Sequence, residues 1–108
     1  MSFFRIPELP GTDMFPGIER RAVWLNHAMV TFFTFQPHSV VPEHSHENEQ
    51  ITVVTSGAME FSLGDEKHIL STGDGVCIPP NVSHSAHILD EITEAFDAWG
   101  PPRDDYKS

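Results

Sequence analysis

Apolar residues occur along the chain in short runs that are rich in β-branched and aromatic side chains. Within several runs apolar and polar positions alternate, which is the repeat of a half-buried β-strand. No segment of helical length carries its apolar residues at the spacing of an amphipathic helix. The pattern predicts strands near residues 20–26, 28–36, 49–55, 58–63, 67–70, 75–78, 85–89 and 93–99.

Turn signals divide these runs at short intervals. Ser56-Gly57 and Gly64-Asp65 separate neighbouring runs by the length of a hairpin turn. Many short strands joined by tight turns are typical of a β-sandwich or a jelly roll, so we expect an all-β fold. The length of 108 residues provides one core, so we expect a single domain over 1–108 with its barrel over about 20–100. The first fifteen residues and the C-terminal PPRDDYKS are expected to form irregular arms.

Composition and charge narrow the range of partners. With 16 acidic and 6 basic residues the net charge is −10, which excludes nucleic acid and anionic membranes as expected partners. A small anionic molecule is still compatible, because one arginine or a bound cation can hold a carboxylate. The chain shows no membrane-spanning run or secretory signal and has a single cysteine, Cys77, so we expect a cytoplasmic protein. The segment 28–36 is apolar at both parities, which indicates burial on both faces and predicts a homodimer.

The segment PEHSHENEQITVVTSG, residues 42–57, places two histidines one residue apart ahead of a strand. His44, His46 and Gln50 share one parity, so along a regular strand they project to one face while Glu49 points away. Downstream, GDGVCIPPNVSH brings His84 after a turn and a loop stiffened by proline. A histidine pair alone is also common at exposed strands, so the interpretation depends on the whole pattern. The histidines without such a context, which we place outside the site, are His27, His38, His68 and His87.

This pattern resembles the first motif of the cupin superfamily, G-x5-H-x-H-x3,4-E-x6-G. His44, His46, the residue at position 50 and Gly57 match it in order. His38 stands where the motif begins with glycine. The likeness extends beyond the histidine pair, because the spacing to the hairpin glycine is kept.

The second cupin motif, G-x5-P-x-G-x2-H-x3-N, is matched by Gly73, Pro79 and His84. Asn81 replaces its second glycine, a mild change because asparagine tolerates the left-handed backbone, and Ile88 replaces its asparagine. The resemblance implies a cupin double-stranded β-helix, the jelly-roll barrel. It also implies a divalent metal ion, for which Ni, Zn, Mn and Fe are all compatible, held by His44, His46 and His84.

The largest departure from the cupin motif is Gln50, which stands in place of glutamate. Three neutral imidazoles and an amide oxygen leave the charge of a divalent ion uncancelled. That arrangement suits Lewis-acid chemistry, whereas two histidines with a carboxylate are the geometry of oxygen-activating iron. With Gln50 as the fourth ligand, as its strand parity indicates, we therefore expect non-redox chemistry. A β-bulge that turned Glu49 inward would instead favour an oxygenase.

The C-terminal segment EAFDAWGPPRDDY carries a second group of candidates. Asp97 and Trp99 share a strand face, and Arg103 follows a Gly-Pro-Pro corner. An acid, an aromatic wall and an arginine suit an acidic sugar through proton transfer, stacking and carboxylate pairing. From the residues alone, a solvated aspartate, a core tryptophan and a surface arginine paired with a nearby aspartate are the simpler explanation.

The tail pattern D-x-aromatic-x-P-P-R resembles the uronate-linearising family of pectin degradation protein KdgF, with Trp99 and Gly100 where that family more often has phenylalanine and serine. The resemblance implies metal ligands at the three histidines and Gln50, and a pocket formed by Asp97, the aromatic residue and Arg103. It implies a metal-dependent isomerase that converts 4,5-unsaturated uronate monosaccharides from pectin or alginate to 5-keto-4-deoxyuronate. The alternatives are an Fe(II) cupin dioxygenase and a non-catalytic cupin that binds a sugar or another metabolite.

Overall fold

The computed structural model describes residues 2–107, and these form ten β-strands and two short 3-10 helices. Within this part of the chain no helix is long and apolar enough to cross a membrane. The strands are β1 (Thr12–Phe15), β2 (Ile18–Trp24), β3 (Met29–Phe35), β4 (Val40–His44), β5 (Glu49–Ser56), β6 (Ala58–Leu63), β7 (Glu66–Ser71), β8 (Gly75–Ile78), β9 (His84–Ile88) and β10 (Thr93–Gly100). The 3-10 helices are η1 (Ile6–Glu8) and η2 (Asp104–Tyr106).

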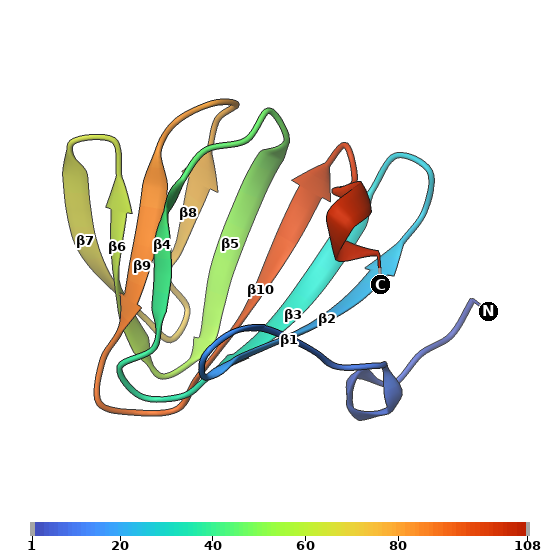
Figure 1. Ribbon diagram of the computed structural model, residues 1–108, viewed down its shortest axis with the longest axis horizontal. Coiled ribbons are helices and arrows are strands. Elements are labelled where there is room, and N and C mark those ends of the chain that lie inside the picture. Colours follow the sequence, from blue (N-terminus) through green and yellow to red (C-terminus); the bar gives the residue numbers. More distant parts are fainter. Residues whose placement is uncertain (1, 108) are drawn as a thin grey trace.

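The strands form two sheets that face each other (Figure 1). One sheet has six strands in the order β1-β2-β3-β10-β5-β8, and the other has four in the order β4-β9-β6-β7. All of the pairings are antiparallel. The predicted all-β jelly roll is therefore confirmed.

Alternation along the strands separates the inside of the sandwich from its surface. In β3 every second residue, from Met29 to Phe35, is buried, and in β10 the same holds from Thr93 to Trp99. The inward residues of both sheets form one hydrophobic core, which includes Phe33, Val54 and Met59. The polar residues buried on the strands interrupt this hydrophobic interior, and they lie on β2, β3, β5, β9 and β10.

Each of the eight predicted runs overlaps a strand, but two further strands were not predicted. The strand β4 contains Pro42 and Glu43, which read as a loop because proline cannot donate a strand hydrogen bond. The strand β1 lies in the segment expected to be irregular, and its pairing with β2 corrects that expectation. At the other end, η2 forms inside the predicted C-terminal arm and its Tyr106 is buried.

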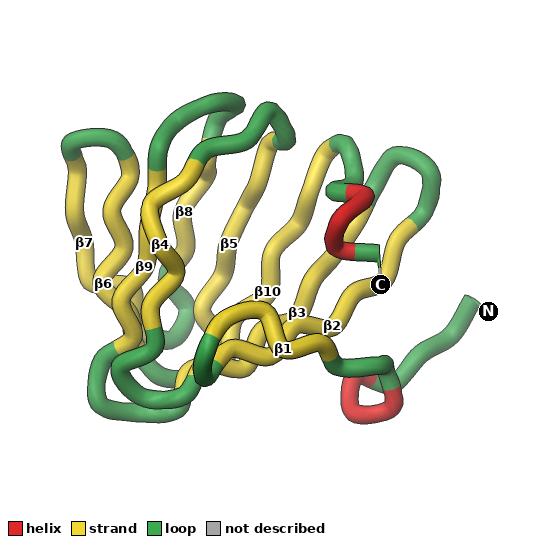
Figure 2. Tube along the Cα trace, viewed as in Figure 1, coloured by secondary structure: helices red, strands yellow, loops and turns green. Residues whose placement is uncertain are grey.

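The loops that matter for the site leave the sheets at one end. Figure 2 shows the β4–β5 loop, the β8–β9 loop and the segment after β10 at the same, upper end of the sandwich. Hydrogen bonds connect them: the backbone N–H of Asn81 donates to the carbonyl of His46 over 2.7 Å, and the Asn48 amide donates to the carbonyl of Pro101 over 2.8 Å. Three parts of the sequence that lie far apart therefore meet there.

The outer face of the six-stranded sheet carries part of the apolar segment 28–36, from which a homodimer was predicted. Phe32 points to this face, and Phe4 from the N-terminal arm lies over it with ring centroids 6.0 Å apart. Part of the apolar character of 28–36 is thus covered by the chain itself. Cys77 is exposed on the same sheet, because β8 is an edge strand and the residue faces outward. The homodimer stays a prediction.

Candidate metal centre

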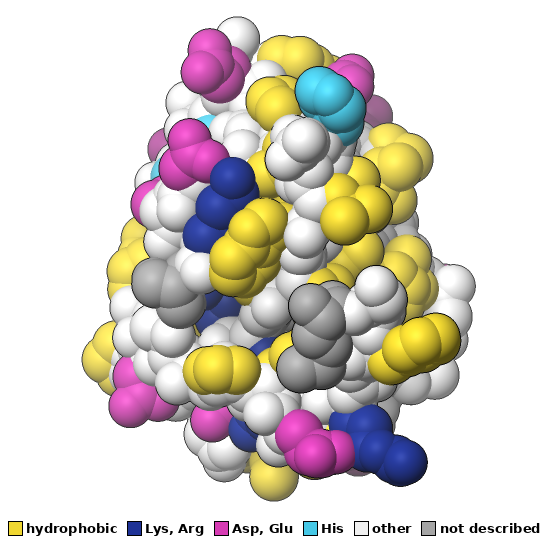
Figure 3. Space-filling model, turned by 90° about the vertical axis from the view of Figure 1, so that its right-hand side faces the viewer, with side chains coloured by type: hydrophobic (Ala, Val, Ile, Leu, Met, Phe, Trp, Pro, Cys, Tyr) yellow, Lys and Arg dark blue, Asp and Glu magenta, His cyan; other side chains and the backbone are white. Residues whose placement is uncertain are grey.

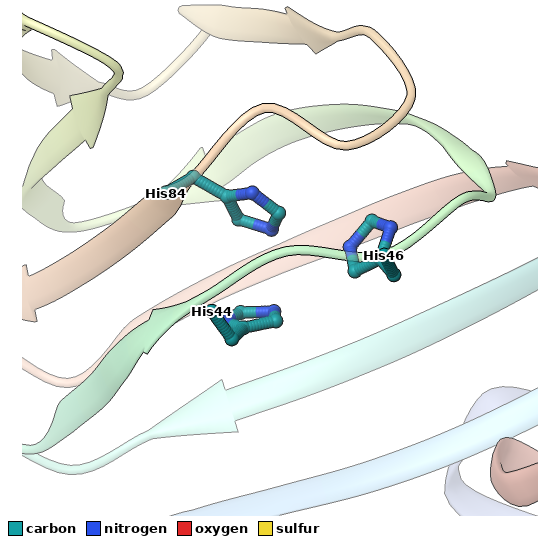
Figure 4. Close-up of side chains that lie close together, drawn as sticks. All are labelled: His44, His46 and His84. Atoms are coloured by element: carbon teal, nitrogen blue, oxygen red, sulfur yellow. The ribbon is translucent and has the colours of Figure 1, made fainter.

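Three histidines converge between the two sheets. His44 is the last residue of β4, His46 lies in the loop that follows, and His84 is the first residue of β9. One ring nitrogen from each lies within 4.8 Å of the others. Figure 4 shows the three rings gathered in one space. Three imidazole nitrogens gathered this closely could hold one divalent ion.

The tautomer of each histidine is set by its backbone neighbours. Nδ1 of His44 lies 2.9 Å from the carbonyl of Pro42, and Nδ1 of His84 lies 2.9 Å from the carbonyl of Val82. Nδ1 of His46 lies 2.9 Å from the carbonyl of Asn48. A carbonyl only accepts, so each Nδ1 carries the proton and each Nε2 presents a lone pair. Metal-binding histidines are commonly oriented in this way.

His84 is the most deeply buried of the three rings, with 3% of its surface exposed. Its Nε2 is buried and has no hydrogen-bond partner within the described part of the chain. Burial lowers the pKa of His84 from 6.5 to about 4, and burial likewise lowers the pKa of His46. Both rings are therefore neutral at pH 7, which is the form that binds a metal.

Gln50 completes the cluster from the opposite sheet. It is the second residue of β5 and is 7% exposed, whereas Glu49 is exposed on the outer face. The predicted orientation of these two residues is confirmed, although for a different reason. The chain from 44 to 50 is not one strand, since β4 ends at His44 and β5 begins at Glu49. The alternation within β5 alone turns Gln50 inward.

The contact between His46 and Gln50 indicates a cation. Oε1 of Gln50 lies 3.0 Å from Nε2 of His46, while Nε2 of Gln50 donates to Oγ1 of Thr52 over 2.9 Å. Because His46 holds its proton on Nδ1, both atoms of the 3.0 Å contact are hydrogen-bond acceptors. Two facing lone pairs repel unless a positive ion lies beside both of them. The donor set therefore fits a divalent metal ion.

The backbone around the cluster explains two departures in the motifs. Asn81 has a φ of +64°, in the left-handed region where a glycine would be expected, and His38 also has a φ of +64°. Both therefore keep the conformation that glycine would supply. At Asn81 this conformation places the N–H that holds the carbonyl of His46, so the loop fixes the position of a ligand.

Asp97 lies beside the histidine cluster in the interior. It faces Thr52 across the β5–β10 pairing, and the Thr52 hydroxyl donates to Oδ1 of Asp97 over 2.6 Å. Burial raises the pKa of Asp97 from 3.8 to about 7, against the opposing effect of hydrogen bonds from Thr52 and Gln50. A carboxyl group with this pKa can both hold and release a proton near neutral pH, as acid–base catalysis requires.

Trp99 and Arg103 occupy different positions relative to the cavity. Trp99 is 5% exposed, packs 5.1 Å from the His46 ring and donates its indole N–H to Oγ1 of Thr31 over 2.9 Å. Arg103 lies over Tyr106, 4.1 Å from the ring centroid, and is paired with Asp105 at 2.9 Å. The cavity is bordered by Trp99 and Tyr106, with Arg103 behind them.

The structure brings together most of the predicted site. One cavity is lined by His44, His84, Gln50, Asp97 and Trp99, and His46 packs against Trp99 and Gln50 at its side. The side chains that sequence reasoning did not identify are Thr31, Thr52, Tyr106 and Arg20, the last of which is buried and stacks 4.2 Å from the centroid of Tyr106. The burial of these four depends on strand register and on the position of η2, which no local pattern records.

In metal-free protein, Asp97 and His84 give opposite contributions to the pH dependence of stability. As pH rises from 3.8 to about 7, Asp97 releases its proton in the unfolded chain but keeps it in the folded chain. The stability that Asp97 contributes at low pH is therefore lost over this range. As pH falls from 6.5 to about 4, His84 binds a proton in the unfolded chain but not in the folded chain. The free energy of unfolding therefore decreases as pH falls through this range.

The Asp97→Asn variant loses the Asp97 contribution and keeps that of the buried histidines. Its free energy of unfolding, relative to wild type, is therefore expected to increase by roughly 4 kcal/mol between pH 4 and pH 7. Urea unfolding in the presence of chelator measures this difference. Parallel pH curves for the two proteins would contradict the assignment.

Comparison with known proteins is consistent with the geometry. The family model for the cupin domain matches residues 31–96. The chain belongs to the cupin superfamily. The curated pectin degradation protein KdgF of Dickeya dadantii is 29% identical over 106 residues, which cover 96% of each chain. The structure of KdgF from Halomonas sp. is 36% identical, covers 97% of both chains and superimposes with a TM-score of 0.91.

A more distant cupin shares the fold over the same length. An RmlC-like cupin from Shewanella frigidimarina is 21% identical, with a TM-score of 0.92 and coverage of 98% of this chain and 96% of that one. At this identity the match supports the architecture alone. Among these small cupins, the resemblance to KdgF predicted from the motifs is confirmed by both the curated relative and the solved structure.

Proposed function

We propose that this cupin is a metal-dependent isomerase that converts 4,5-unsaturated uronate monosaccharides to 5-keto-4-deoxyuronate. The observation that carries the proposal is the convergence of three histidine nitrogens and the Gln50 oxygen beside a buried Asp97. The KdgF relatives, named for pectin degradation, support the same substrate class. Unsaturated uronates arise when lyases cleave pectin or alginate, and they carry the carboxylate for which an arginine near the cavity is suited.

His44, His46, His84 and Gln50 would hold the metal ion. A divalent ion bound there supplies Lewis acidity, which polarises a sugar oxygen and lowers the pKa of a hydroxyl group. The neutral histidines and the amide leave the ion's charge available for this purpose. Nickel, zinc, manganese and iron all suit such a donor set.

Asp97 would move the proton. Opening of the hemiacetal ring gives an aldehyde at C1 and an enol at C5, and the enol hydroxyl loses a proton while C4 gains one. Oδ1 of Asp97 accepts a hydrogen bond from the Thr52 hydroxyl, which fixes the carboxyl group that would carry the transferred proton. The reaction is an isomerisation with no net change in protons or electrons, so it needs no oxidant.

Trp99 and Arg103 would orient the sugar. The indole is fixed by its hydrogen bond to Thr31 and borders the cavity, so it can cover one face of the ring. Both the Nε and Nη2 atoms of Arg103 donate to Asp105, which is the paired geometry that a carboxylate adopts on an arginine. A substrate carboxylate would exchange with the exposed Asp105 side chain.

The basic residues of this acidic chain are concentrated on one side. Of the six, only Lys67 lies outside the two terminal segments and β2. Figure 3 views the side that carries both termini and shows dark-blue basic side chains in the middle of it. Arg5, Arg21, Arg103 and Lys107 are each paired with a neighbouring carboxylate, so an anionic substrate would compete with these acids for an arginine.

Replacing Gln50 and Glu49 in turn tests the fourth ligand. Gln50→Ala is expected to weaken metal affinity by about tenfold, because an inward oxygen donor is lost. Glu49→Ala is the matched control on the same strand, and its metal affinity is expected to stay within about twofold of wild type, since its side chain faces solvent. Isothermal titration with Ni²⁺ measures both, and a larger effect at Glu49 than at Gln50 would contradict this ligand assignment.

Turnover of an unsaturated uronate with simultaneous oxygen measurement tests the function. The isomerase is expected to abolish the absorbance of the 4,5 double bond without consuming oxygen. Substrate-dependent oxygen uptake would support the Fe(II) dioxygenase instead. Ligand-induced thermal stabilisation with no product would support the non-catalytic cupin.

A further inference from the structure

We infer that Thr52 is a positioning residue for the metal centre: it fixes the side-chain amide of Gln50 so that its oxygen, and not its nitrogen, faces the histidines. The inference rests on the proposed function in so far as that function requires a bound metal. It concerns a residue that lines the cavity but lies outside the proposed ligand set. It acts only through the orientation of Gln50.

The local geometry places Thr52 between the two groups. Thr52 is 4% exposed and faces inward on β5, two residues after Gln50 on the same strand face. Its cross-strand neighbour on β10 is Asp97. Its hydroxyl oxygen accepts from Nε2 of Gln50 over 2.9 Å and donates to Oδ1 of Asp97 over 2.6 Å. The hydroxyl therefore connects the amide to the carboxylate.

The number of hydrogens on the hydroxyl determines which way the amide turns. Thr52 has a single hydroxyl hydrogen, and Asp97 receives it. Toward Gln50 the hydroxyl can then only accept, so the NH₂ end of the amide must face Thr52. The other end, Oε1, is consequently directed at Nε2 of His46, 3.0 Å away. An amide turned by half a rotation would present an NH₂ group, which cannot bind a metal.

Among the residues in 2–107, the carboxylates nearest in sequence to Gln50 do not replace this control. Glu47 and Glu49 are exposed, and the Asn48 amide donates to the carbonyl of Pro101. The Gln50 side chain contacts His46 and Thr52, and its NH₂ group also donates to the Asp97 carboxylate that Thr52 holds. Without the Thr52 hydroxyl, the amide would lose one of the two acceptors that keep its NH₂ end turned away from the histidines.

Two substitutions separate the hydroxyl from the shape of the side chain. Thr52→Val keeps the volume and removes the hydroxyl, and its Kd for Ni²⁺ in chelator-treated protein is expected to rise by about tenfold. Thr52→Ser keeps the hydroxyl and removes a methyl group, and its Kd is expected to stay within about twofold of wild type. An unchanged Kd for the valine variant, or an equal loss in both variants, would overturn the inference.

A double variant tests whether Thr52 acts through Gln50. In the Gln50→Ala background, Thr52→Val is expected to cause no further change in the Kd for Ni²⁺, because the amide that Thr52 orients is gone. Additive losses would mean that Thr52 acts by another route and would overturn the inference. Thermal unfolding of the metal-free variants shows whether each one is folded during the titration.

The titration separates this inference from the proposed function. One outcome is that the Kd values for Ni²⁺ are as expected but neither the wild type nor any variant turns over a uronate. The proposed reaction would then be wrong, and the role of Thr52 would stand. If uronate turnover requires metal but the affinity of Thr52→Val equals that of wild type, the role of Thr52 fails alone. A wild-type protein that binds no Ni²⁺ would overturn both.

Discussion

Replacing Asp97 by asparagine is expected to lower turnover of a 4,5-unsaturated uronate by about 1,000-fold, within the range contributed by a positioned acid or base. Asparagine has nearly the same shape and can still accept from Thr52 through its amide oxygen. It cannot carry a transferable proton. Metal content and substrate affinity are therefore expected to change little, so the loss should be seen in kcat. Steady-state kinetics of metal-loaded protein measure it.

The matched control is Glu94→Gln on the same strand. Glu94 is exposed and faces outward from β10, so its loss of charge is expected to leave kcat within about twofold of wild type. Metal analysis of each protein confirms equal loading. An Asp97→Asn variant that turns over at the rate of wild type would remove Asp97 from the proton-transfer role.

Replacing His84 by alanine is expected to weaken metal binding by more than about 100-fold, since even partners outside the ligand set can contribute 10–100-fold. The His84 Nε2 atom is buried and has no hydrogen-bond partner among residues 2–107, so its lone pair is available to a metal ion. Activity is expected to fall with the bound metal. Titration with Ni²⁺, followed by metal analysis after desalting, measures the loss.

His87→Ala is the control for this variant. His87 belongs to the same strand, β9, but is exposed on the outer face, so its removal is expected to leave metal affinity unchanged. Because alanine at His84 leaves a cavity in the interior, His46→Gln provides a second test in a less buried position. If both ligand variants are folded and bind Ni²⁺ as tightly as wild type, the histidine cluster is not the metal site.

Much of the site could be predicted, because its residues stand at motif spacings or follow the alternation of a β-strand. The pair His44 and His46 and the later His84 stand at motif spacings, and the alternation in β5 separates Gln50 from Glu49. The latter prediction was right although its premise of one continuous strand was wrong. The chain leaves β4 at His44 and re-enters a different sheet at Glu49, so His44 and Gln50 approach each other from opposite sheets.

The supporting residues could not be predicted, because nothing local distinguishes them. A threonine inside a strand is ordinary, since β-branched residues favour strands. Thr52 acquires its place only through the register that puts it opposite Asp97, and Thr31 only through the indole of Trp99. Register depends on contacts between distant segments, which one sequence does not display.

Strand β4 and the 3-10 helix η2 also could not be predicted from the local sequence. Pro42 and Glu43 lower the strand signal of β4, yet this strand delivers His44 to the site by pairing with β9. In the C-terminal segment, Tyr106 is a single aromatic residue among charged neighbours. Its burial between Arg20 and Arg103 follows from packing against Trp99, which local composition does not reveal.

Metal dependence of uronate turnover tests the central claim most directly. Wild-type protein is stripped with chelator, dialysed and titrated with Ni²⁺ while the absorbance of the 4,5 double bond is followed. We expect no turnover without metal, and a rate that rises in proportion to added Ni²⁺ until one ion is bound per chain. Full turnover by stripped protein, or none by protein carrying one bound ion per chain, would contradict the account.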